Sequence, residues 1–468
     1  MKLIAESGST RTEWALVEDN HLIQRVFTEG LNPFFQTRRE ISRSVRLGLP
    51  ETFFKRKLEQ VYYYGAGCTS YEKKNVLGAS LVAQFKTPIQ VESDLLAAAR
   101  GLFKCEAGID CRNYGLLEGI PEARRLLGAM TEVTPDKIII FGNSSLNVMF
   151  DTISRSMTHG VCGNTPWCKL DKVKFLCPAP GYDRHFKITE YFGIEMITVP
   201  MTPTGPDMDM VEKLVSSDDA IKGIWCVPKY SNPQGITYSE ETVKRFARLK
   251  PAAPDFRIFW DNAYCIHHLY EEKDFLLEIL EECEKVGNPD LAYKFLSTSK
   301  VSFPGSGIAA VAASPRNLED IKKHMSIQTI GHDKINQLRH VRFFKDIDGM
   351  HEHMKKHAEI LRPKFEAVEN TLEKEIGGLG IGEWTNPKGG YFISFESMEG
   401  CAKAIVAKAA EAGVKMTDAG ATYPYGKDPH DSNIRIAPSF PTLEELQTAT
   451  EIFVLCVKLV SVVKLLAE

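Results

Sequence analysis

The 468-residue sequence lacks the features that mark nucleic-acid-binding, zinc-binding and secreted proteins. A net charge of −4 and a pI near 6.3 give no reason to expect a nucleic-acid partner or an anionic membrane surface. The eleven cysteines include no Cys-x-x-Cys pair, and the spacing of Cys162 and Cys168 does not suit a zinc site. An odd cysteine count without a secretory signal indicates reduced thiols. We therefore predict a cytoplasmic protein with no metal site.

Long uninterrupted apolar runs and internal repeats are also missing. The most apolar run, residues 452–466, is interrupted by Lys458 and Lys464, which favours a packed helix over a membrane span. We therefore expect no membrane association. A chain of this length that is 43% hydrophobic and 25% charged is typical of a globular protein with two or three domains.

From about residue 118 onward, short apolar strands alternate with helices. Strands are predicted at residues 137–141, 173–177, 195–200, 223–227, 256–261 and 293–297, and helices at residues 120–130, 143–154, 208–216 and 239–249. This alternation predicts an α/β fold with a mostly parallel sheet covered on both faces. Beyond about residue 345, a long helix, a Gly-Gly-Tyr-Phe strand and two further helices indicate a smaller α+β domain.

A lysine, an acid and a tyrosine carry the strongest chemical signal. Lys300 ends the run Ser-Thr-Ser-Lys and lies 39 residues after Asp261, which is followed closely by Tyr264. A lysine can hold pyridoxal phosphate (PLP) as a Schiff base, while a carboxylate keeps the pyridine nitrogen protonated. A phenol can hydrogen-bond the 3-oxygen of the ring, and serines can bind the phosphate. Taken alone, such a lysine is usually an ordinary surface residue.

Two further motifs follow predicted strands and a third lies in a short strand, and each has a plain structural alternative. The run Gly-Asn-Ser-Ser at residues 142–145 could bind a phosphate at the start of a helix, or it could only cap that helix. Asn232, in an Asn-Pro-Gln-Gly turn, could reach a cofactor ring or simply form a turn. Arg435 could bind a substrate carboxylate through two nitrogens, or it could be a solvated surface charge.

The order of these motifs resembles the fold-type I PLP-dependent aminotransferases, most closely the aspartate aminotransferase subgroup Ic of class I. The resemblance covers about residues 106–465 and rests on the runs GNSSLN, KFLCPAPGYDRHF, IKGIWCVPKYSNPQGITYS, FRIFWDNAYCIHHL, STSK, TIGHDKINQLRH, NPKGGYFIS and NIRIAPSFP. It implies that the protein uses PLP and transfers the amino group of aspartate, or a similar amino acid, to a 2-oxo acid such as 2-oxoglutarate. It also implies a homodimer.

The same resemblance implies a role for each candidate residue. Lys300 would hold PLP and shuttle the proton, Asp261 would pair with the pyridinium nitrogen, and Tyr264 with Asn232 would hydrogen-bond the 3-oxygen. Arg435, together with Asn232, would bind the substrate. The other cofactor-binding candidates are Asn143, Ser144, Ser145, Ser297 and Ser299 near the phosphate, Tyr182 against the ring, and Tyr114 reaching the phosphate of the neighbouring subunit.

Two departures from the family pattern stand out. Most of the superfamily has a phosphate-binding arginine about eight residues after the lysine, whereas residues 301–307 contain none. The second departure is that the usual N-terminal segment is replaced by a different one. A second cation for a distal carboxylate is also needed; Arg339 and Arg184 are candidates, and each could equally be structural.

The replacement segment, residues 1 to about 103, resembles part of an actin-type sugar kinase, from the BadF/BadG and N-acetylglucosamine kinase-like branch. The run AESGSTRTEW resembles its first phosphate loop, with Glu6 where an aspartate is usual, and Asp94 matches the general base. The resemblance stops near Phe103, and no second lobe follows it. Because phosphoryl transfer depends on positioning both reactants, a truncated lobe should not phosphorylate a sugar.

These observations predict three domains and one leading function. We expect a partial actin-like ATPase lobe at residues 1–104, a PLP-binding large domain at residues 105–344 and a small domain at residues 345–468. The leading hypothesis is an aminotransferase that acts on small amino acids and 2-oxo acids. The alternatives are an N-acetylglucosamine-type sugar kinase and a PLP-binding fusion protein with impaired catalysis.

Overall fold

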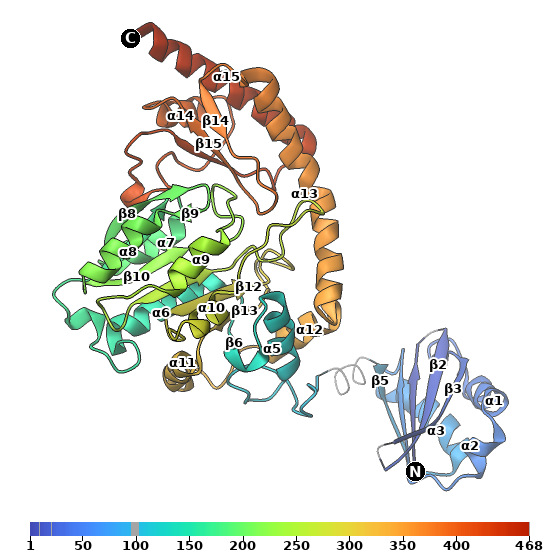
Figure 1. Ribbon diagram of the computed structural model, residues 1–468. Helices are drawn as coiled ribbons and strands as arrows, with labels where there is room; N and C mark the ends of the chain where they lie inside the picture. Colours follow the sequence, from blue (N-terminus) through green and yellow to red (C-terminus); the bar gives the residue numbers. More distant parts are fainter. Residues whose placement is uncertain (9, 20, 95–102, 468) are drawn as a thin grey trace. The chain divides into compact units, whose positions relative to one another are not determined.

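The computed structural model describes residues 1–8, 10–19, 21–94 and 103–467, and these form two compact units (Figure 1). The first unit is Met1–Asn113 and the second is Tyr114–Glu468. Each unit has hydrophobic core residues of its own, so each is described separately. The sequence also predicts a helix at residues 94–102, of which only Asp94 lies within the described residues.

The first unit is built on a five-stranded mixed sheet. Its elements are β1 (Lys2–Ser7), β2 (Arg11–Glu18), β3 (His21–Glu29), α1 (Arg38–Gly48), α2 (Glu51–Lys55), β4 (Gln60–Gly65), α3 (Tyr71–Phe85) and β5 (Ile89–Ser93). The strand order is β3-β2-β1-β4-β5, in which β1, β4 and β5 are parallel and the β1–β2 and β2–β3 pairs are antiparallel. Strict alternation of exposed and buried residues along β1 shows that one face of the sheet packs on the core.

Residues at the carboxyl ends of the three parallel strands in this unit lie in register. Ser7 pairs with Gly65, and Gly65 pairs with Ser93. Behind this edge, Trp14 and Tyr63 meet in the core with ring centroids 6.1 Å apart. The sheet therefore aligns the small-residue turns of the segment along one edge.

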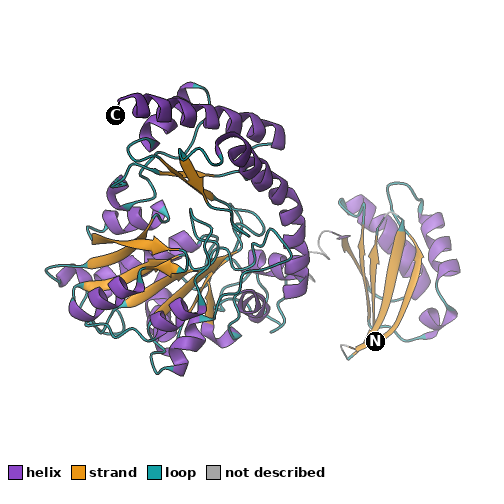
Figure 2. Cartoon of the chain, turned by 45° about the horizontal axis from the view of Figure 1, so that its top comes forward, coloured by secondary structure: helices purple, strands orange, loops and turns teal. Residues whose placement is uncertain are grey.

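The second unit contains an eight-stranded sheet with helices on both faces (Figure 2). Its elements as far as residue 328 are α5 (Pro121–Met130), β6 (Ile138–Ile140), α6 (Ser145–His159), β7 (Lys174–Ala179), α7 (Asp183–Tyr191), β8 (Glu195–Thr202), β9 (Gly205–Pro206), α8 (Met208–Ser217), β10 (Ile221–Cys226), α9 (Glu240–Ala247), β11 (Arg257–Asp261), α10 (Ile279–Lys285), β12 (Ala292–Ser297), β13 (Ala309–Ala312) and α11 (Pro315–Gln328). Short 3-10 helices occupy Pro135–Lys137, Trp167–Lys169 and Pro424–Gly426.

The strand order is β6-β13-β12-β11-β10-β7-β8-β9. The run from β12 to β8 is parallel, and the strands outside it pair in antiparallel fashion. Strands β10, β11 and β12 are buried along their whole length, as expected for strands covered on both faces. The predicted mostly parallel α/β sheet is therefore confirmed.

The C-terminal part of the second unit consists of long helices and a three-stranded antiparallel sheet. Its elements are α12 (Lys334–Phe344), α13 (Ile347–Ile376), β14 (Gly382–Trp384), β15 (Ile393–Ser397), α14 (Ala402–Glu411), β16 (Asn433–Ile436) and α15 (Leu443–Ala467). The predicted Gly-Gly-Tyr-Phe strand is wrong in position: β15 begins after these residues, because Gly390 has a φ of +85° that a regular strand does not accommodate. Among the described residues, no helix has the length and apolarity needed to cross a membrane.

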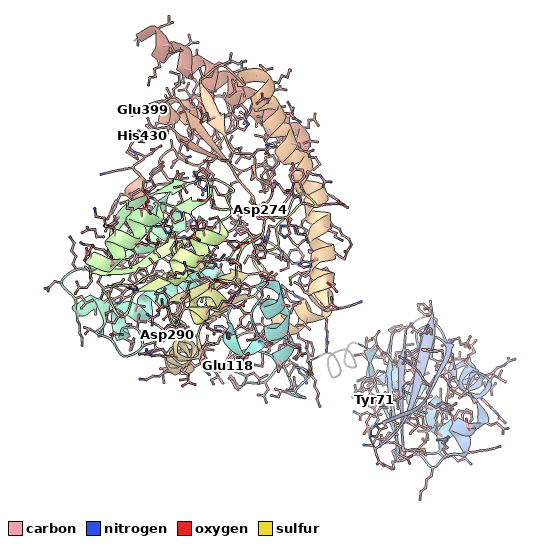
Figure 3. All side chains as sticks on the ribbon, in the orientation of Figure 1. Tyr71, Glu118, Asp274, Asp290, Glu399 and His430 are labelled. Atoms are coloured by element: carbon pink, nitrogen blue, oxygen red, sulfur yellow. The ribbon has the colours of Figure 1, made fainter. Side chains whose placement is uncertain are left out.

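Figure 3 labels Glu118, Glu399 and His430, which take part in ion pairs of this unit. Glu118 pairs with both Arg124 and Lys322 at 2.8 Å, and His430 lies 3.3 Å from Glu399. The Glu118 pairs are partly exposed and the His430 pair is exposed, and pairs of this kind contribute about 0–1 kcal/mol each. The buried strands and helix faces therefore supply most of the stability of the frame that carries the site.

Candidate active site

The predicted site residues lie after the carboxyl ends of neighbouring parallel strands. Asp261 ends β11, Ser297 ends β12 with Lys300 three residues later, and Asn232 lies in the turn after β10. Because these strands are parallel, their carboxyl ends share one edge of the sheet, which is where ligands bind in such folds. The topology therefore brings Asp261, Asn232 and Lys300 to one place.

Asp261 has one partnered and one unpartnered carboxylate oxygen. The residue is 3% exposed, and its Oδ2 lies 3.0 Å from Nε2 of His185. Its Oδ1 is buried and has no hydrogen-bond partner among the described residues. A buried acceptor without a partner is costly, so this atom indicates the position of a donor on a ligand. A protonated pyridine nitrogen is a donor that fits this position.

His185 is a site residue that the sequence did not reveal. Its ring stacks on Trp225 with centroids 4.4 Å apart and an interplanar angle of 10°, and Tyr182 meets it edge-on at 4.9 Å. Trp225 is itself fixed by a 2.8 Å hydrogen bond from its Nε1 to Oγ1 of Thr189. The only sequence signal is the spacing of three residues from Tyr182, which places both rings near one face of α7.

Lys300 and Tyr264 face each other across the site. The Lys300 Nζ lies 4.8 Å from the centroid of the Tyr264 ring. Burial lowers the pKa of the Lys300 amine, while the charge of Asp261 acts in the opposite direction. Burial, reinforced by the charge of Asp261, raises the pKa of Tyr264 well above its usual value. The site thus combines a lysine biased toward its nucleophilic neutral form with a phenol that keeps its proton.

The predicted phosphate turn leads directly into α6. Ser144 precedes the helix, yet its side chain makes no capping hydrogen bond, and Ser145 is buried at the first helical position. A helix start without a side-chain cap retains amide donors and a positive dipole end for an anion. The Ser299 hydroxyl donates to the carbonyl of Asn143 at 2.8 Å, so the phosphate turn and the lysine segment are tied together.

Arg435, on β16, reaches the same site from the C-terminal sheet. Its Nη1 donates to Oδ1 of Asp183 at 2.7 Å and to Oδ1 of Asn232 at 3.1 Å. Its guanidinium carbon lies 5.1 Å from the centroid of the Phe392 ring. Its Nε is buried and lacks a partner within the described part of the chain. The contact with Asp183 was not predicted, and the Nε edge is the donor left for an anion.

The remaining candidates lie away from this cluster of contacts. Tyr114 is 78% exposed, and Arg184 is exposed on α7. Arg339 donates to the carbonyl of Ser306 at 3.0 Å and lines a cavity of about 360 Å³ together with Asn143. Arg339 is therefore placed beside the phosphate turn.

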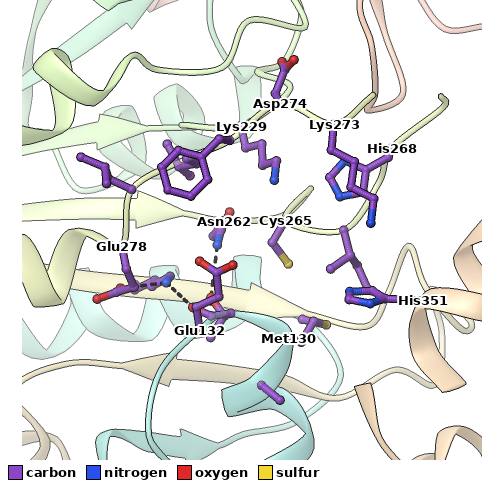
Figure 4. A pocket seen from close by; sticks show the side chains of 17 residues that line it. Met130, Glu132, Lys229, Asn262, Cys265, His268, Lys273, Asp274, Glu278 and His351 are labelled. Atoms are coloured by element: carbon purple, nitrogen blue, oxygen red, sulfur yellow. Dashed lines mark hydrogen bonds and ion pairs between the residues drawn. The ribbon is translucent and has the colours of Figure 1, made fainter. Parts of the chain in front are cut away.

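Another cavity, of about 270 Å³, is lined by residues that neighbour Asp261 and Tyr264 in the sequence (Figure 4). Asn262 and Cys265 line it, and the Lys229 side chain extends into it. Its charged lysine, aspartate and glutamate residues are Lys229, Lys273, Lys294, Glu132, Asp274 and Glu278. Cations and carboxylates are thus balanced, and Lys294 is already paired with Glu278 at 2.8 Å. The residues that line this cavity therefore favour neither an anionic nor a cationic ligand.

A lysine, an aspartate and a tyrosine at the edge of this α/β sheet define the class of the protein: it has the fold of the fold-type I PLP-dependent aminotransferases. A family model described as aspartate amino-transferase matches residues 86–468, and the chain belongs to that family. The protein is therefore a PLP-dependent transaminase. The unpartnered Asp261 oxygen and the uncapped start of α6 fit the ring nitrogen and the phosphate of that cofactor.

Relatives support this assignment over most of the chain. A protein of Mycolicibacterium smegmatis that is named as an aminotransferase is 46% identical over 362 residues, which are 77% of this chain and 85% of that protein. Aspartate aminotransferase of Corynebacterium glutamicum is 44% identical over 368 residues, 78% of this chain and 85% of that protein. The crystal structure of an aspartate transaminase from C. glutamicum matches with a TM-score of 0.75 and 43% identity, covering 78% of this chain and 88% of that chain.

A more distant structure shares the fold alone. It is an α-aminoadipate aminotransferase from Thermus thermophilus complexed with N-(5′-phosphopyridoxyl)-L-leucine, with a TM-score of 0.64 and 20% identity over 79% of this chain and 88% of that chain.

Proposed function

We propose that this transaminase moves the amino group of aspartate, or a similar amino acid, to a 2-oxo acid such as 2-oxoglutarate, and that it belongs to subgroup Ic. The observation that carries the proposal is the Arg435 fork beside Asn232, at the edge of the sheet that holds Asp261 and Lys300. The naming of the C. glutamicum relative as an aspartate aminotransferase supports the same substrate class.

In this proposal, the chain's own groups bind and orient both ligands. When bound, PLP supplies a carbonyl carbon that bonds to amino groups and a protonated ring that accepts electrons. Asp261 Oδ1 accepts the hydrogen bond of the ring nitrogen, while His185 holds Oδ2 in place. Tyr264, which keeps its proton, donates to the 3-oxygen, and the amide nitrogen of Asn232 donates beside it because its oxygen accepts from Arg435.

Lys300 is the proposed proton carrier as well as the covalent anchor of the cofactor. Its lowered pKa leaves more of the amine neutral, so Nζ would take the proton from the substrate Cα and deliver it to the C4′ carbon of the cofactor. Arg435 binds the substrate α-carboxylate through the Nε edge, while Asp183 and Asn232 hold Nη1. The start of α6 and its neighbours are proposed to bind the phosphate through Asn143, Ser144, Ser145, Ser297 and Ser299, and Tyr182 is proposed to lie against the ring.

A visible absorption spectrum tests this function. The purified protein, reconstituted with PLP, should be yellow, and aspartate should convert the cofactor to its amine form with loss of the visible band. Lys300→Ala should abolish the band that depends on the covalent link. A colourless protein that cannot be reconstituted would overturn the proposal. A stable band that aspartate leaves unchanged would instead support the alternative of a PLP-binding protein with impaired catalysis.

We also propose a homodimer in which Tyr114 reaches the phosphate of the neighbouring subunit. The 78% exposure of Tyr114 supports this role. Sedimentation should give twice the 52.4 kDa mass of the chain. Tyr114→Phe should weaken PLP retention without altering that mass. A monomer that retains PLP and full activity would contradict the proposal.

The proposed domain boundaries remain residues 1–104, 105–344 and 345–468. The separate core of the first unit and the start of α13 at Ile347 support them. Limited proteolysis with mass spectrometry tests the first boundary: cleavage between residues 95 and 113 should release two folded fragments. Cleavage only within the sheet formed by β1 to β5 would argue against this boundary.

A second candidate function concerns the first unit, which we propose to be a truncated actin-like ATPase lobe. The observation that favours it is the register of Ser7, Gly65 and Ser93 at one edge of three parallel strands, because this edge carries the candidate phosphate loop and Asp94. A kinase needs enclosure of both substrates, so we expect no turnover of ATP with N-acetylglucosamine. ATP consumption that disappears in Asp94→Asn would establish the kinase instead.

A further inference from the structure

We propose that residues 387–391, here called the strap, together with His267, position Lys300 through its main-chain carbonyl and couple it to Arg435. Two side chains donate to that carbonyl oxygen: the Tyr391 hydroxyl at 3.1 Å and the His267 Nε2 at 3.3 Å. Neither donor contacts the reacting atoms, so both are positioning residues. The inference rests on the proposed role of Lys300 and extends it to the groups that hold the lysine in place.

The strap is bound to the segment that follows Tyr264 by main-chain pairing. The amide of Leu269 donates to the carbonyl of Lys388 at 3.0 Å, and the amide of Gly390 donates to the carbonyl of His267 at 2.9 Å. His268 and Gly389 form an antiparallel bridge between these two bonds. The strap is therefore in fixed register with the segment that carries the second donor.

Two glycines allow the strap to approach this closely. A Cβ on Gly389 would lie 2.4 Å from Cε2 of Tyr230 and 2.5 Å from the carbonyl oxygen of His267. Gly390 has a φ of +85°, and a Cβ there would lie 2.9 Å from Cβ of Tyr230. Contacts this short leave no room for a side chain, so the strap presses its backbone against the turn that leads to Asn232.

Near neutral pH, Tyr391 keeps its hydroxyl proton and the neutral His267 ring keeps one N–H, so each can donate one hydrogen bond. Burial raises the pKa of Tyr391 to about 12, and the hydroxyl remains a donor. Burial lowers the pKa of His267 to about 3, so the ring is neutral. A carbonyl can only accept, which places the single proton of the neutral ring on Nε2. The Nδ1 of His267 is buried and has no partner among the described residues, which fits this tautomer.

The strap also leads directly to the substrate arginine. Tyr391 and Phe392 precede β15, and in the β15–β16 pair Ser394 lies opposite Arg435. Phe392 is the ring beneath the Arg435 guanidinium. A shift of β16 when a carboxylate binds is thus passed along two bonded strands to the Tyr391 hydroxyl and to the Lys300 carbonyl.

Hydrogen exchange tests the positioning role without depending on activity. In cofactor-free protein, Tyr391→Phe should speed exchange at the amides of Val301 and Ser302, which close the turn onto Thr298. Loss of one buried neutral hydrogen bond corresponds to about a fivefold change. Tyr270→Phe is the matched control: it removes a phenol of the same region whose hydroxyl faces Glu366, and its exchange should equal that of the wild type. Equal exchange in Tyr391→Phe would refute the positioning role.

Coupling is tested with the loaded enzyme by a double-mutant cycle of Tyr391→Phe and Arg435→Lys. Tyr391→Phe should lower kcat about fivefold, with little change in KM. Independent sites give effects that multiply, whereas coupled sites depart from the product. We expect most of the Tyr391→Phe effect to vanish when Arg435 is already changed. Effects that multiply would overturn the coupling.

His267→Leu provides a second route if Tyr391→Phe fails to fold, because it removes the other donor and should speed exchange at the same two amides. The proposed function has a separate test: a wild-type protein without a cofactor band fails as a transaminase, whatever the exchange rates are. The two failures are therefore distinguishable.

Discussion

The two units differ in how they treat buried polar atoms. In the first unit, the buried hydroxyls satisfy one another: Ser7 Oγ and Thr12 Oγ1 are 2.6 Å apart, and the Tyr63 hydroxyl donates to the carbonyl of Leu31 at 3.1 Å. In the second unit, buried atoms of Asp261 and Arg435 lack partners among the described residues. Partners are expected for nearly all buried polar groups. This difference indicates that buried polar atoms without partners, gathered at strand ends, mark a ligand site. Buried polar groups that hydrogen-bond within the protein instead have a structural role.

The largest effect is expected when the charge of Asp261 is removed. Asp261→Asn should slow the aspartate half-reaction about 10³-fold, because removing one charge from a buried interacting pair costs about 3–5 kcal/mol. Stopped-flow absorbance measures the rate. Ser7→Ala, which removes a buried polar atom from the first unit, is the matched control and should leave the rate unchanged. Similar losses in both variants would erase the contrast between the units.

The next largest effect is expected when the core of one unit is weakened, because the two units should unfold independently. Leu77→Ala in the first core should destabilise that unit by about 3 kcal/mol, because a buried leucine leaves a cavity. Urea titration followed by hydrogen exchange should show earlier unfolding of residues 1–94, with the cofactor band retained. Leu372→Ala, in the C-terminal core, should make the second unit unfold earlier, so that the cofactor band is lost while residues 1–94 stay protected. Simultaneous loss of both signals in Leu77→Ala would show that the units unfold together.

A smaller effect is expected when the guanidinium group of Arg435 is replaced by an amine of the same charge. Arg435→Lys keeps the charge but loses the fork, so KM for aspartate should rise about 30-fold, equivalent to about 2 kcal/mol for a charged hydrogen bond. Steady-state kinetics measures this. Arg245→Lys, on a surface ion pair with Glu212, serves as the control and should leave KM unchanged. An unchanged KM in Arg435→Lys would place the carboxylate elsewhere.

The smallest effect is a difference in the response to pH. Burial, with the charge of Glu366, raises the pKa of Glu369 to about 7. A raised carboxyl pKa means that the folded state binds the extra proton, so stability falls as pH rises from about 4.5 to 7. After allowance for solvent screening, the contribution is about 1 kcal/mol. Glu369→Gln should therefore stabilise the second unit at pH 8 more than at pH 5, as measured by urea unfolding.

The first unit should respond in the opposite sense. Hydrogen bonds from the backbone and side chain of Thr37 lower the pKa of Glu40, so that stability is present above pH 4.5 and is lost only as pH falls through the lowered value. Glu40→Gln should therefore have a larger effect at pH 6 than at pH 3. Identical pH responses in the two units would contradict this assignment.

The sequence predicted the residues whose signal is local. Asp261, Lys300 and Asn232 follow apolar strands at recognisable spacings, and their convergence follows from parallel pairing alone. His185 and Tyr391 could not be predicted in this way. Their roles depend on a helix face turned toward β11 and on a strap from a distant part of the chain. Tertiary packing sets such contacts, and one sequence carries no record of them.

The stacking of Trp225 on His185 has an optical consequence. Trp225 stacks on His185, the partner of Asp261, so a PLP ring bound at Asp261 would lie near it, and we expect energy transfer to the cofactor to quench its emission. Trp14 is the single tryptophan of residues 1–113, and it belongs to the other core. Of the five tryptophans of the chain, Trp225 should lose emission when cofactor binds, and Trp14 should report when the first unit melts. Titration with PLP and heating can then be followed in a single unlabelled sample.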